Sequence, residues 1–180
     1  MPARKRVAKR STPTPSVRRW IILRVAIVAR GGESLSTPPG RDMLASSSHT
    51  FAELATAIDR AFGRWDLAHL HEFRFSDGRV IGTADTDEFG DDENEIDERR
   101  MTIGAAALAV GDSFEYVFDF GDGWEHRCTV LRGDVDPVEE SGRKSPEIVP
   151  IFGWGALPDQ YGRTRPDSVD PMTNGVDDAL

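Results

Sequence analysis

The chain has 180 residues, of which 38% are hydrophobic and 29% are charged, so it has room for one domain of ordinary size with polar tails. Its net charge of −9 is uneven, because residues 1–20 hold seven Lys or Arg and no acid, while the other 160 residues hold 15 basic and 31 acidic side chains. This acidic body argues against nucleic-acid binding by that part of the chain, and a single Cys excludes an internal disulfide.

Residues 1–18 lack apolar periodicity and are predicted to form a disordered basic arm. We favour a solubilising tail or a misassigned start codon for this arm, and an electrostatic tether to DNA or RNA is the alternative. The apolar run from Trp20 to Ala29 predicts a central strand, interrupted only by Arg24. Because this run is much shorter than the ~20 apolar residues that a membrane span requires, we expect no membrane partner. The single Cys fits a reducing compartment, so we expect a cytoplasmic protein.

A helix is predicted over residues 50–63, after a loop at 31–41 that is rich in Gly, Pro and Ser. Thr50 followed by Glu53 matches a capping box, in which both side chains bind free amides at the helix start. Apolar residues then recur at helical spacing, and Gly63 supplies the stop. The apolar stripe should lie on the sheet, and it consists of Phe51, Leu54, Ala55, Ile58, Ala61 and Phe62.

Alternating residues over 69–75 predict a second strand, because this period places every second side chain on the same face. Asp77-Gly78 then marks a hairpin turn before Val80. One face of the predicted strand carries His69, His71, Phe73 and Phe75.

Residues 84–98 are strongly acidic and contain nine carboxylates. An EF-hand calcium loop that began at Asp85 would have the expected Gly90 at its sixth position, but its twelfth position is Ile96 in place of the required Glu. We therefore predict a solvated acidic loop without a specific calcium site. The Ala-rich segment that follows, at 103–109, predicts one or two helical turns.

The strongest pattern is a hairpin over residues 114–131, where aromatic and polar residues alternate on both sides of a Gly-Asp-Gly turn. A two-residue turn would mix aromatic and charged side chains on one face. We therefore predict a three-residue loop from Gly121 to Gly123, with Gly123 in the left-handed conformation. This register pairs Phe120 with Trp124, Phe118 with His126 and Tyr116 with Cys128, and it puts Asp119, Glu125 and Arg127 on the opposite face.

These elements predict an α+β fold, with a mainly antiparallel sheet of about five strands and one principal helix (about 50–63) packed on one face. We place the domain at residues 19–158, with disordered ends at 1–18 and 159–180. Gly and Pro are frequent in the last part of the domain, where the expected anchors are Ile148, Ile151, Phe152 and Trp154.

Four stretches within residues 20–131 carry a family resemblance: FAELATAIDRAFGRWD, HLHEFRF, DERRMTI and YVFDFGDGWEHRCTV. In this order they resemble the Ri-plasmid ORF-three-like family, also called the transposon-passenger TnpR family. The resemblance implies a bacterial α+β domain associated with mobile elements, and it brings no settled catalytic residues. The family's usual cysteine-containing segment after the hairpin is missing here, so a metal function of that segment is in doubt. The TnpR label suggests a resolvase, but the sequence has no serine-recombinase pattern.

The candidate site is a group of polar side chains that the predicted strands bring near the hairpin turn. His69 and His71 project from one face of a strand, where a carboxylate from a neighbouring strand could join them to bind a divalent metal or to act as acid and base. The spacing matches no HExxH-type motif, and the alternative is that His71 and His126 are core residues while the aspartates brace the turn. The candidate cluster consists of His69, His71, Glu72, Asp119, Asp122, Glu125 and His126.

Two functions remain open at this stage. The first is a non-catalytic binding or accessory module of a mobile-element family, which contacts an unknown protein partner through the acidic body or the basic arm. The second is a small metal-dependent hydrolase or nuclease whose metal ligands would be His69, His71, Asp119 and His126. We favour the first, which needs no metal or other cofactor. Cys128 alternates inward and is predicted to be a buried apolar residue rather than a nucleophile.

Overall fold

A computed structural model describes residues 18–83, 95–143 and 145–162. The helices in this part of the chain are α1 (Phe51–Ala61) and α2 (Pro137–Ser141). The strands are β1 (Trp20–Arg30), β2 (Glu33–Ser34), β3 (Gly40–Ser46), β4 (His71–Phe75), β5 (Val80–Gly82), β6 (Glu95–Asp97), β7 (Ser113–Phe118), β8 (Trp124–Gly133) and β9 (Val149–Trp154).

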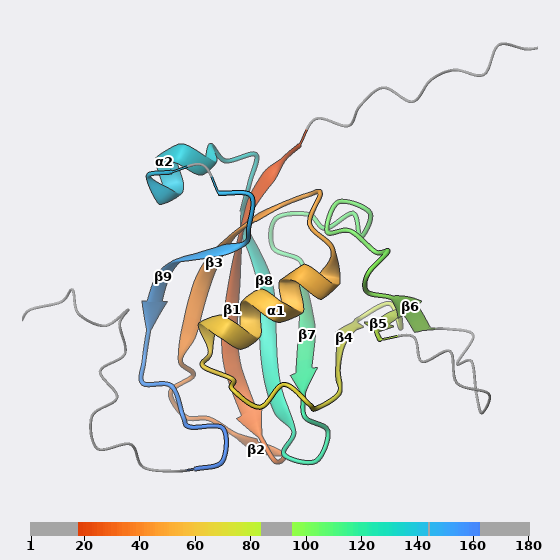
Figure 1. The fold of residues 1–180 in the computed structure, drawn as a ribbon, viewed down its shortest axis with the longest axis vertical. Helices are drawn as coiled ribbons and strands as arrows, with labels where there is room; N and C mark the ends of the chain where they lie inside the picture. The colour runs from red at the N-terminus through yellow and green to blue at the C-terminus, as the bar shows by residue number, and fades with distance from the viewer. Residues whose placement is uncertain (1–17, 84–94, 144, 163–180) are drawn as a thin grey trace, which may run out of the picture.

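A single sheet contains these nine strands (Figure 1). Eight of them follow the order β6-β5-β4-β7-β8-β1-β3-β9, and β2 pairs with β1 beside this path. Neighbouring strands are antiparallel, except that β5 and β6 run parallel. Helix α1 lies across one face of the sheet in front of β1 and β8 (Figure 1). The sheet therefore has a helix-covered face, and in the described residues its path of eight strands ends at β6 and at β9.

The predicted α+β class is wrong, because the described chain is mostly β, with a nine-stranded mixed sheet and two short helices instead of about five strands and a principal helix. The missed strands lie where composition indicates loops. Strand β3 overlaps the predicted loop at 31–41, and β9 contains Pro150 and Gly153, which are unfavourable in strand interiors. Residues 103–107 form turns instead of helical turns, and Ala107 has a positive φ of 56°. Tertiary pairing outweighs local preference in these segments.

The predicted start of α1 is confirmed. The Thr50 hydroxyl accepts a hydrogen bond from the Glu53 N–H at 3.2 Å, and the Glu53 carboxylate accepts one from the Thr50 N–H at 2.7 Å. The helix ends at Ala61, and Gly63 follows with a φ of +67°. Its apolar stripe is buried and includes Phe51, Leu54, Ala55 and Ile58. Neither described helix has the length and apolar character that a membrane crossing requires.

The loop of the β7–β8 hairpin is longer than predicted, because Phe118 pairs with Trp124 and five residues connect them. Asp119 adopts a left-handed φ of 57°, and its carboxylate accepts hydrogen bonds from the backbone N–H groups of Gly121 and Asp122 at 3.0 and 3.2 Å. This Asp-centred turn starts the loop two residues earlier than a three-residue loop would. Gly123 is left-handed, with a φ of 57°, as predicted.

The predicted inward face of the hairpin is nevertheless confirmed, since a shift of two residues leaves every side chain on its original face. Tyr116, Trp124 and Cys128 are fully buried. Phe120 is the exception, because it lies in the loop and is 50% exposed. The burial of each large side chain in this core contributes about 1.5–3 kcal/mol.

Strands β3 and β9 pack closely because each places a large side chain over a glycine of the other strand. A Cβ atom on Gly40 would lie 2.2 Å from the Trp154 ring, so Trp154 occupies the space over that glycine. A Cβ atom on Gly153 would lie 2.8 Å from the Arg41 side chain, which is itself buried. The Arg41 guanidinium donates hydrogen bonds to the carbonyls of Gly40 and Trp154. Each strand therefore holds the other's largest side chain over a glycine.

Candidate functional site

The histidines of the predicted cluster do not meet in one site. His69, His71 and His126 instead lie in three different environments. Within residues 18–83, 95–143 and 145–162, no group of three or more His, Cys, Asp and Glu side chains is arranged to hold a metal ion. The metal-ligand set proposed from the sequence is therefore not assembled in this structure.

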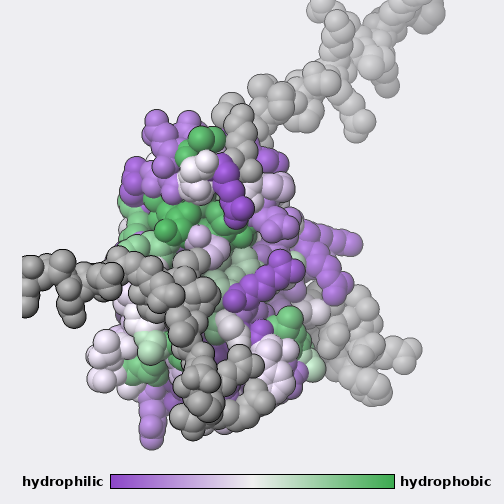
Figure 2. Space-filling model, turned by 60° about the vertical axis from the view of Figure 1, so that its left-hand side comes forward, coloured by the Kyte–Doolittle hydropathy of each residue, from purple (hydrophilic) through white to green (hydrophobic). Residues whose placement is uncertain are grey.

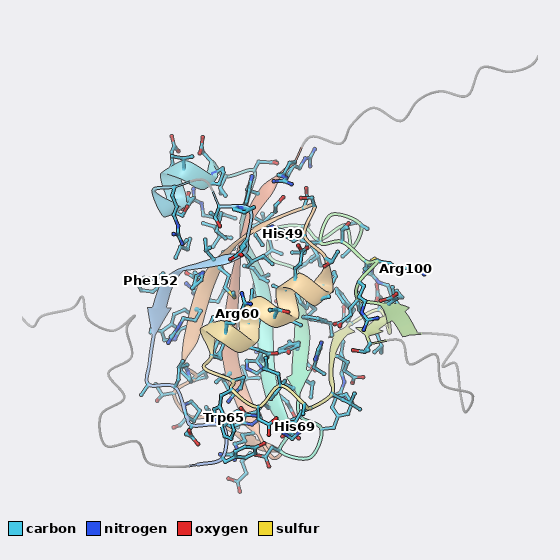
Figure 3. The ribbon with its side chains drawn as sticks, viewed as in Figure 1. His49, Arg60, Trp65, His69, Arg100 and Phe152 are labelled. Atoms are coloured by element: carbon cyan, nitrogen blue, oxygen red, sulfur yellow. The ribbon has the colours of Figure 1, made fainter. Side chains whose placement is uncertain are left out.

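His69 lies at the lower end of the sheet (Figure 3), where its ring and that of Trp65 both pack against Tyr161. Its Nδ1 atom is 3.2 Å from the Asp119 carboxylate, and its Nε2 atom is 2.8 Å from the Tyr161 hydroxyl. The same hydroxyl donates a hydrogen bond of 2.8 Å to the Asp66 carboxylate. This bond raises the pKa of Tyr161 and, together with the Ala68 N–H, lowers the pKa of Asp66.

The order of carboxylate, imidazole and hydroxyl in this network superficially matches a catalytic triad. A nucleophilic hydroxyl must give its proton to the imidazole, whereas Tyr161 directs its proton to Asp66. The raised pKa of Tyr161 also makes its hydroxyl harder to activate. The network instead connects the hairpin loop at Asp119 to the segment before β4 and to the segment after β9.

A buried glutamine strengthens the same connection. The side-chain oxygen of Gln160 accepts hydrogen bonds from the backbone N–H groups of Trp65 and Asp66, at 3.1 and 3.2 Å. Its side-chain nitrogen donates to the Asp66 carbonyl at 3.0 Å. Because Gln160 is only 1% exposed, these bonds fix the end of the described chain against the segment after α1.

His71 forms a different pair, since its Nε2 atom is 2.8 Å from the buried carboxylate of Glu98. Burial lowers the pKa of His71, but the hydrogen bond to Glu98 and the negative charges of Glu98 and Asp59 outweigh it, so the pKa is raised. Asp59 is also buried and accepts a hydrogen bond of 2.9 Å from the Tyr116 hydroxyl. Burial raises the pKa of Asp59 to about 6. These groups link α1, β4 and β7 inside the protein.

His126 is a core residue in this structure, with 1% of its surface exposed. Its ring packs edge-on against Phe62 at 5.1 Å, and its Nδ1 atom lies 3.2 Å from the Tyr116 carbonyl. Burial and the charge of Arg64 lower the pKa of His126 to about 3, so the ring is neutral. Arg64 itself is 5% exposed, lies 3.7 Å from the Trp124 ring centre and has no hydrogen bond from its guanidinium to any described residue.

The remaining residues of the predicted cluster have separate partners or lie elsewhere. Asp122 binds Arg30 at 2.9 Å, and Glu72 binds Arg74. Glu125 pairs with the buried Val117 across the hairpin and is itself partly exposed, between the buried Trp124 and His126. Cys128 is fully buried, and burial raises the pKa of its thiol, which makes it a poor nucleophile.

A groove of about 740 Å³ lies beside α1 and the start of β9, and we call it the α1–β9 groove. Figure 2, in which the β9 side comes forward, shows hydrophobic surface in green between hydrophilic residues on this side of the molecule. The helix wall consists of Ala52, Glu53, Thr56, Ala57, Arg60, Ala61 and Gly63. The other wall consists of Glu147, Ile148, Val149, Pro150 and Leu157, and His49 lies at the helix start.

The groove exists because the flank of α1 carries small side chains. Ala52, Ala57 and Ala61 are only half-buried, whereas the adjacent stripe of the helix is fully covered by the sheet. His49 joins the two walls, since its Nε2–H donates to the Pro146 carbonyl at 2.8 Å while its Nδ1 accepts from the Ser46 N–H at 3.0 Å. These two bonds assign the neutral tautomer with the proton on Nε2.

Sequence reasoning missed this groove, although one signal was available. The helix has more apolar positions than its contact with the sheet buries. Ala52, Ala57 and Ala61 lie outside the buried stripe. The second wall could not be found in this way, since Val149 lies 92 positions after Ala57 in the chain.

Comparison with known proteins gives three findings. Residues 34–149 match the family described as plasmid pRiA4b ORF-3-like protein. The uncharacterised protein y4hQ of Sinorhizobium fredii is 38% identical over 106 residues, which cover 54% of this chain and 52% of that protein. The chain thus spans about half the length of this curated relative. A protein of unknown function from Methanosarcina mazei Go1, MM3350, matches the fold with a TM-score of 0.58 and 21% identity over 81% of this chain and 75% of that one.

These findings support the resemblance seen in the sequence and extend it. The family match covers more than half of the chain, and it continues past the hairpin to the first residue of β9. The likeness to the Methanosarcina protein concerns the fold alone, because the identity is low. The chain belongs to the plasmid pRiA4b ORF-3-like protein family.

Proposed function

We propose that this chain is a binding module that holds part of a partner protein in the α1–β9 groove and catalyses no reaction. The observation that carries the proposal is the groove itself, which has a volume of about 740 Å³ and walls formed mainly by aliphatic side chains. Binding sites are typically concave and mostly apolar, with a small number of polar groups that orient the ligand. Glu53, Arg60 and Glu147 provide such groups here.

The energetics fit the binding of apolar side chains. Transfer of one large aliphatic or aromatic side chain from water into the groove contributes about 1.5–3 kcal/mol. The small residues Ala52, Ala57 and Ala61 leave the space that such a side chain needs. The three charged groups remain at the wall, where they discriminate between partners more than they add affinity.

An accessory role in a bacterial mobile element is part of the proposal. Its support is the family description, which names a plasmid reading frame. The enzymatic alternative has less support, because Asp119 and Tyr161 engage both ring nitrogens of His69, while His126 lies in the core. We therefore propose no reaction.

Filling the groove tests this proposal. Peptides that bind the full chain are selected from a random library, and their affinities are measured by fluorescence anisotropy for the wild type and for Ala57→Trp. The new indole occupies the groove, so we expect at least a roughly tenfold loss of affinity. The matched control is Ala105→Trp, which adds the same side chain at an exposed alanine on the turns before β7. Peptides that bind Ala57→Trp and the wild type equally well would overturn the proposal.

A further inference from the structure

We infer that the partner enters the groove as an extended strand that pairs with β9 and extends the sheet. This inference rests on the proposed function of the α1–β9 groove and specifies how the partner is recognised. It combines two features that lie next to each other, the groove on the helix side and the open edge of the sheet at β9.

Strand β9 ends the sheet in the described part of the chain, because its only strand partner there is β3. The outer side of an edge strand presents a row of backbone N–H and C=O groups that a further strand can bind. The other edge strand, β6, has three residues, whereas β9 has six. Pro150 has no backbone N–H to donate, and edge strands are the part of a sheet where proline is tolerated.

The two faces of β9 offer different contacts to a strand beside it. Pro150 pairs with Met43, a core residue, so it lies on the helix side with the groove. Phe152 pairs with Asp42 and lies on the opposite face, where it is 57% exposed and stacks on Trp154 at 6.1 Å. Figure 3 shows Phe152 at the outer border of the sheet. An added strand would direct alternate side chains into the groove and toward Phe152.

The partner is a foreign segment and not a second copy of β9. In a pair of β9 strands, the groove-side positions of the second copy would include Pro150 and Gly153. These residues are too small to fill a groove of about 740 Å³. The recognised segment therefore has large apolar residues at alternate positions. Its side chains on one face enter the groove, and a side chain on the other face contacts Phe152.

A backbone methylation scan tests the inference. A selected peptide of about ten residues is synthesised with a single N-methyl group at each position in turn, and each version is tested against the full chain. Only one edge of the peptide pairs with β9, so methylation at every second position should lower affinity about tenfold. Methylation at the intervening positions should change affinity by no more than about twofold. On the protein, Phe152→Ala should weaken binding about fivefold. The control Phe120→Ala, which removes another exposed phenylalanine, should leave binding unchanged.

The possible outcomes separate the two proposals. A peptide that is sensitive to Ala57→Trp but shows no alternation in the scan would overturn strand addition and leave the groove function intact. Loss of binding on methylation at every interior position would also overturn it, because that pattern is expected of a helical peptide. A chain that forms dimers by sedimentation velocity, with dimerisation abolished by Ala57→Trp, would overturn the inference in favour of a second copy. Insensitivity to Ala57→Trp would overturn the proposed function itself.

Discussion

The hairpin of β7 and β8 and the edge strand β9 belong to one sheet but use their side chains in opposite ways. The hairpin holds most of the polar candidates from the sequence, and it satisfies many of them internally, as Asp119 does with the loop amides. Strand β9 has few polar side chains, yet its outer side has no strand partner among the described residues, and it has an adjacent groove and the exposed Phe152. The comparison teaches that polar density in a sequence can reflect the needs of folding, while a binding surface can arise from small and apolar residues.

The largest expected effect is on the free energy of unfolding, and it tests whether the hairpin contributes more to stability than β9 does. Trp124 is fully buried, with the Arg30 and Arg64 guanidinium groups 4.4 and 3.7 Å from its ring centre. Trp124→Ala should therefore lower the free energy of unfolding by about 3–5 kcal/mol. On the β9 side, Phe152→Ala should change it by about 0.5 kcal/mol or less, because that ring is 57% exposed. Urea unfolding curves measure both values, and similar losses of stability for the two variants would contradict the difference between the hairpin and β9.

A second prediction concerns acid and the buried histidine of the hairpin. The folded pKa of His126 is lowered to about 3 from an ordinary value of 6.5, so the unfolded chain binds the proton more strongly. This contribution to stability is fully present above about pH 6.5 and is lost as the pH falls toward 3, with a loss of about 2 kcal/mol between pH 6.5 and pH 5.

The variant His126→Phe provides the comparison for this effect. It cannot titrate, so the acid-dependent loss should shrink by about 2 kcal/mol over that range. Asp59 acts with the opposite sign, because its raised pKa makes stability fall as the pH rises through about 6. The difference between the two pH profiles is therefore the decisive measurement, and identical profiles would contradict the assigned neutral state of His126.

The smallest predicted effect concerns helix α1, which lies over the hairpin strand β8 and also forms one wall of the groove beside β9. Thr50→Ala removes the hydroxyl that accepts from the Glu53 N–H, and it should lower the free energy of unfolding by about 1 kcal/mol. Thr56→Ala is the matched control, since this exposed threonine lies within the helix and only donates back to the Ala52 carbonyl. Thermal or urea unfolding should show no loss for this control. An equal loss for both threonines would show that the cap is unimportant.

The sequence allowed prediction of features that depend on neighbouring residues. Thr50 and Glu53 located the helix start, and the alternation around Trp124 identified the buried face of the hairpin. The loop length was missed because Asp119 takes a left-handed conformation that the Gly-rich tip did not indicate. The fold class was missed because Pro150 and other unfavourable residues obscured strands that pairing stabilises.

Features that depend on distant parts of the chain were beyond sequence reasoning. His69 was identified as a polar candidate, but its contact with Tyr161 joins residues 92 positions apart. His71 was also identified, whereas its partner Glu98 was assigned only to an acidic loop. The β9 wall of the groove and the outer edge of β9 follow from the strand order, which local patterns do not specify.

The exchange of side chains between β3 and β9 has a consequence for how the family can vary. Because Trp154 covers Gly40 and Arg41 covers Gly153, a larger residue at either glycine requires a smaller one opposite. Positions 40 and 154 should therefore covary among related chains, and so should positions 41 and 153. These two linked pairs would let an alignment identify both the register of the last strand and the relatives that share its open edge.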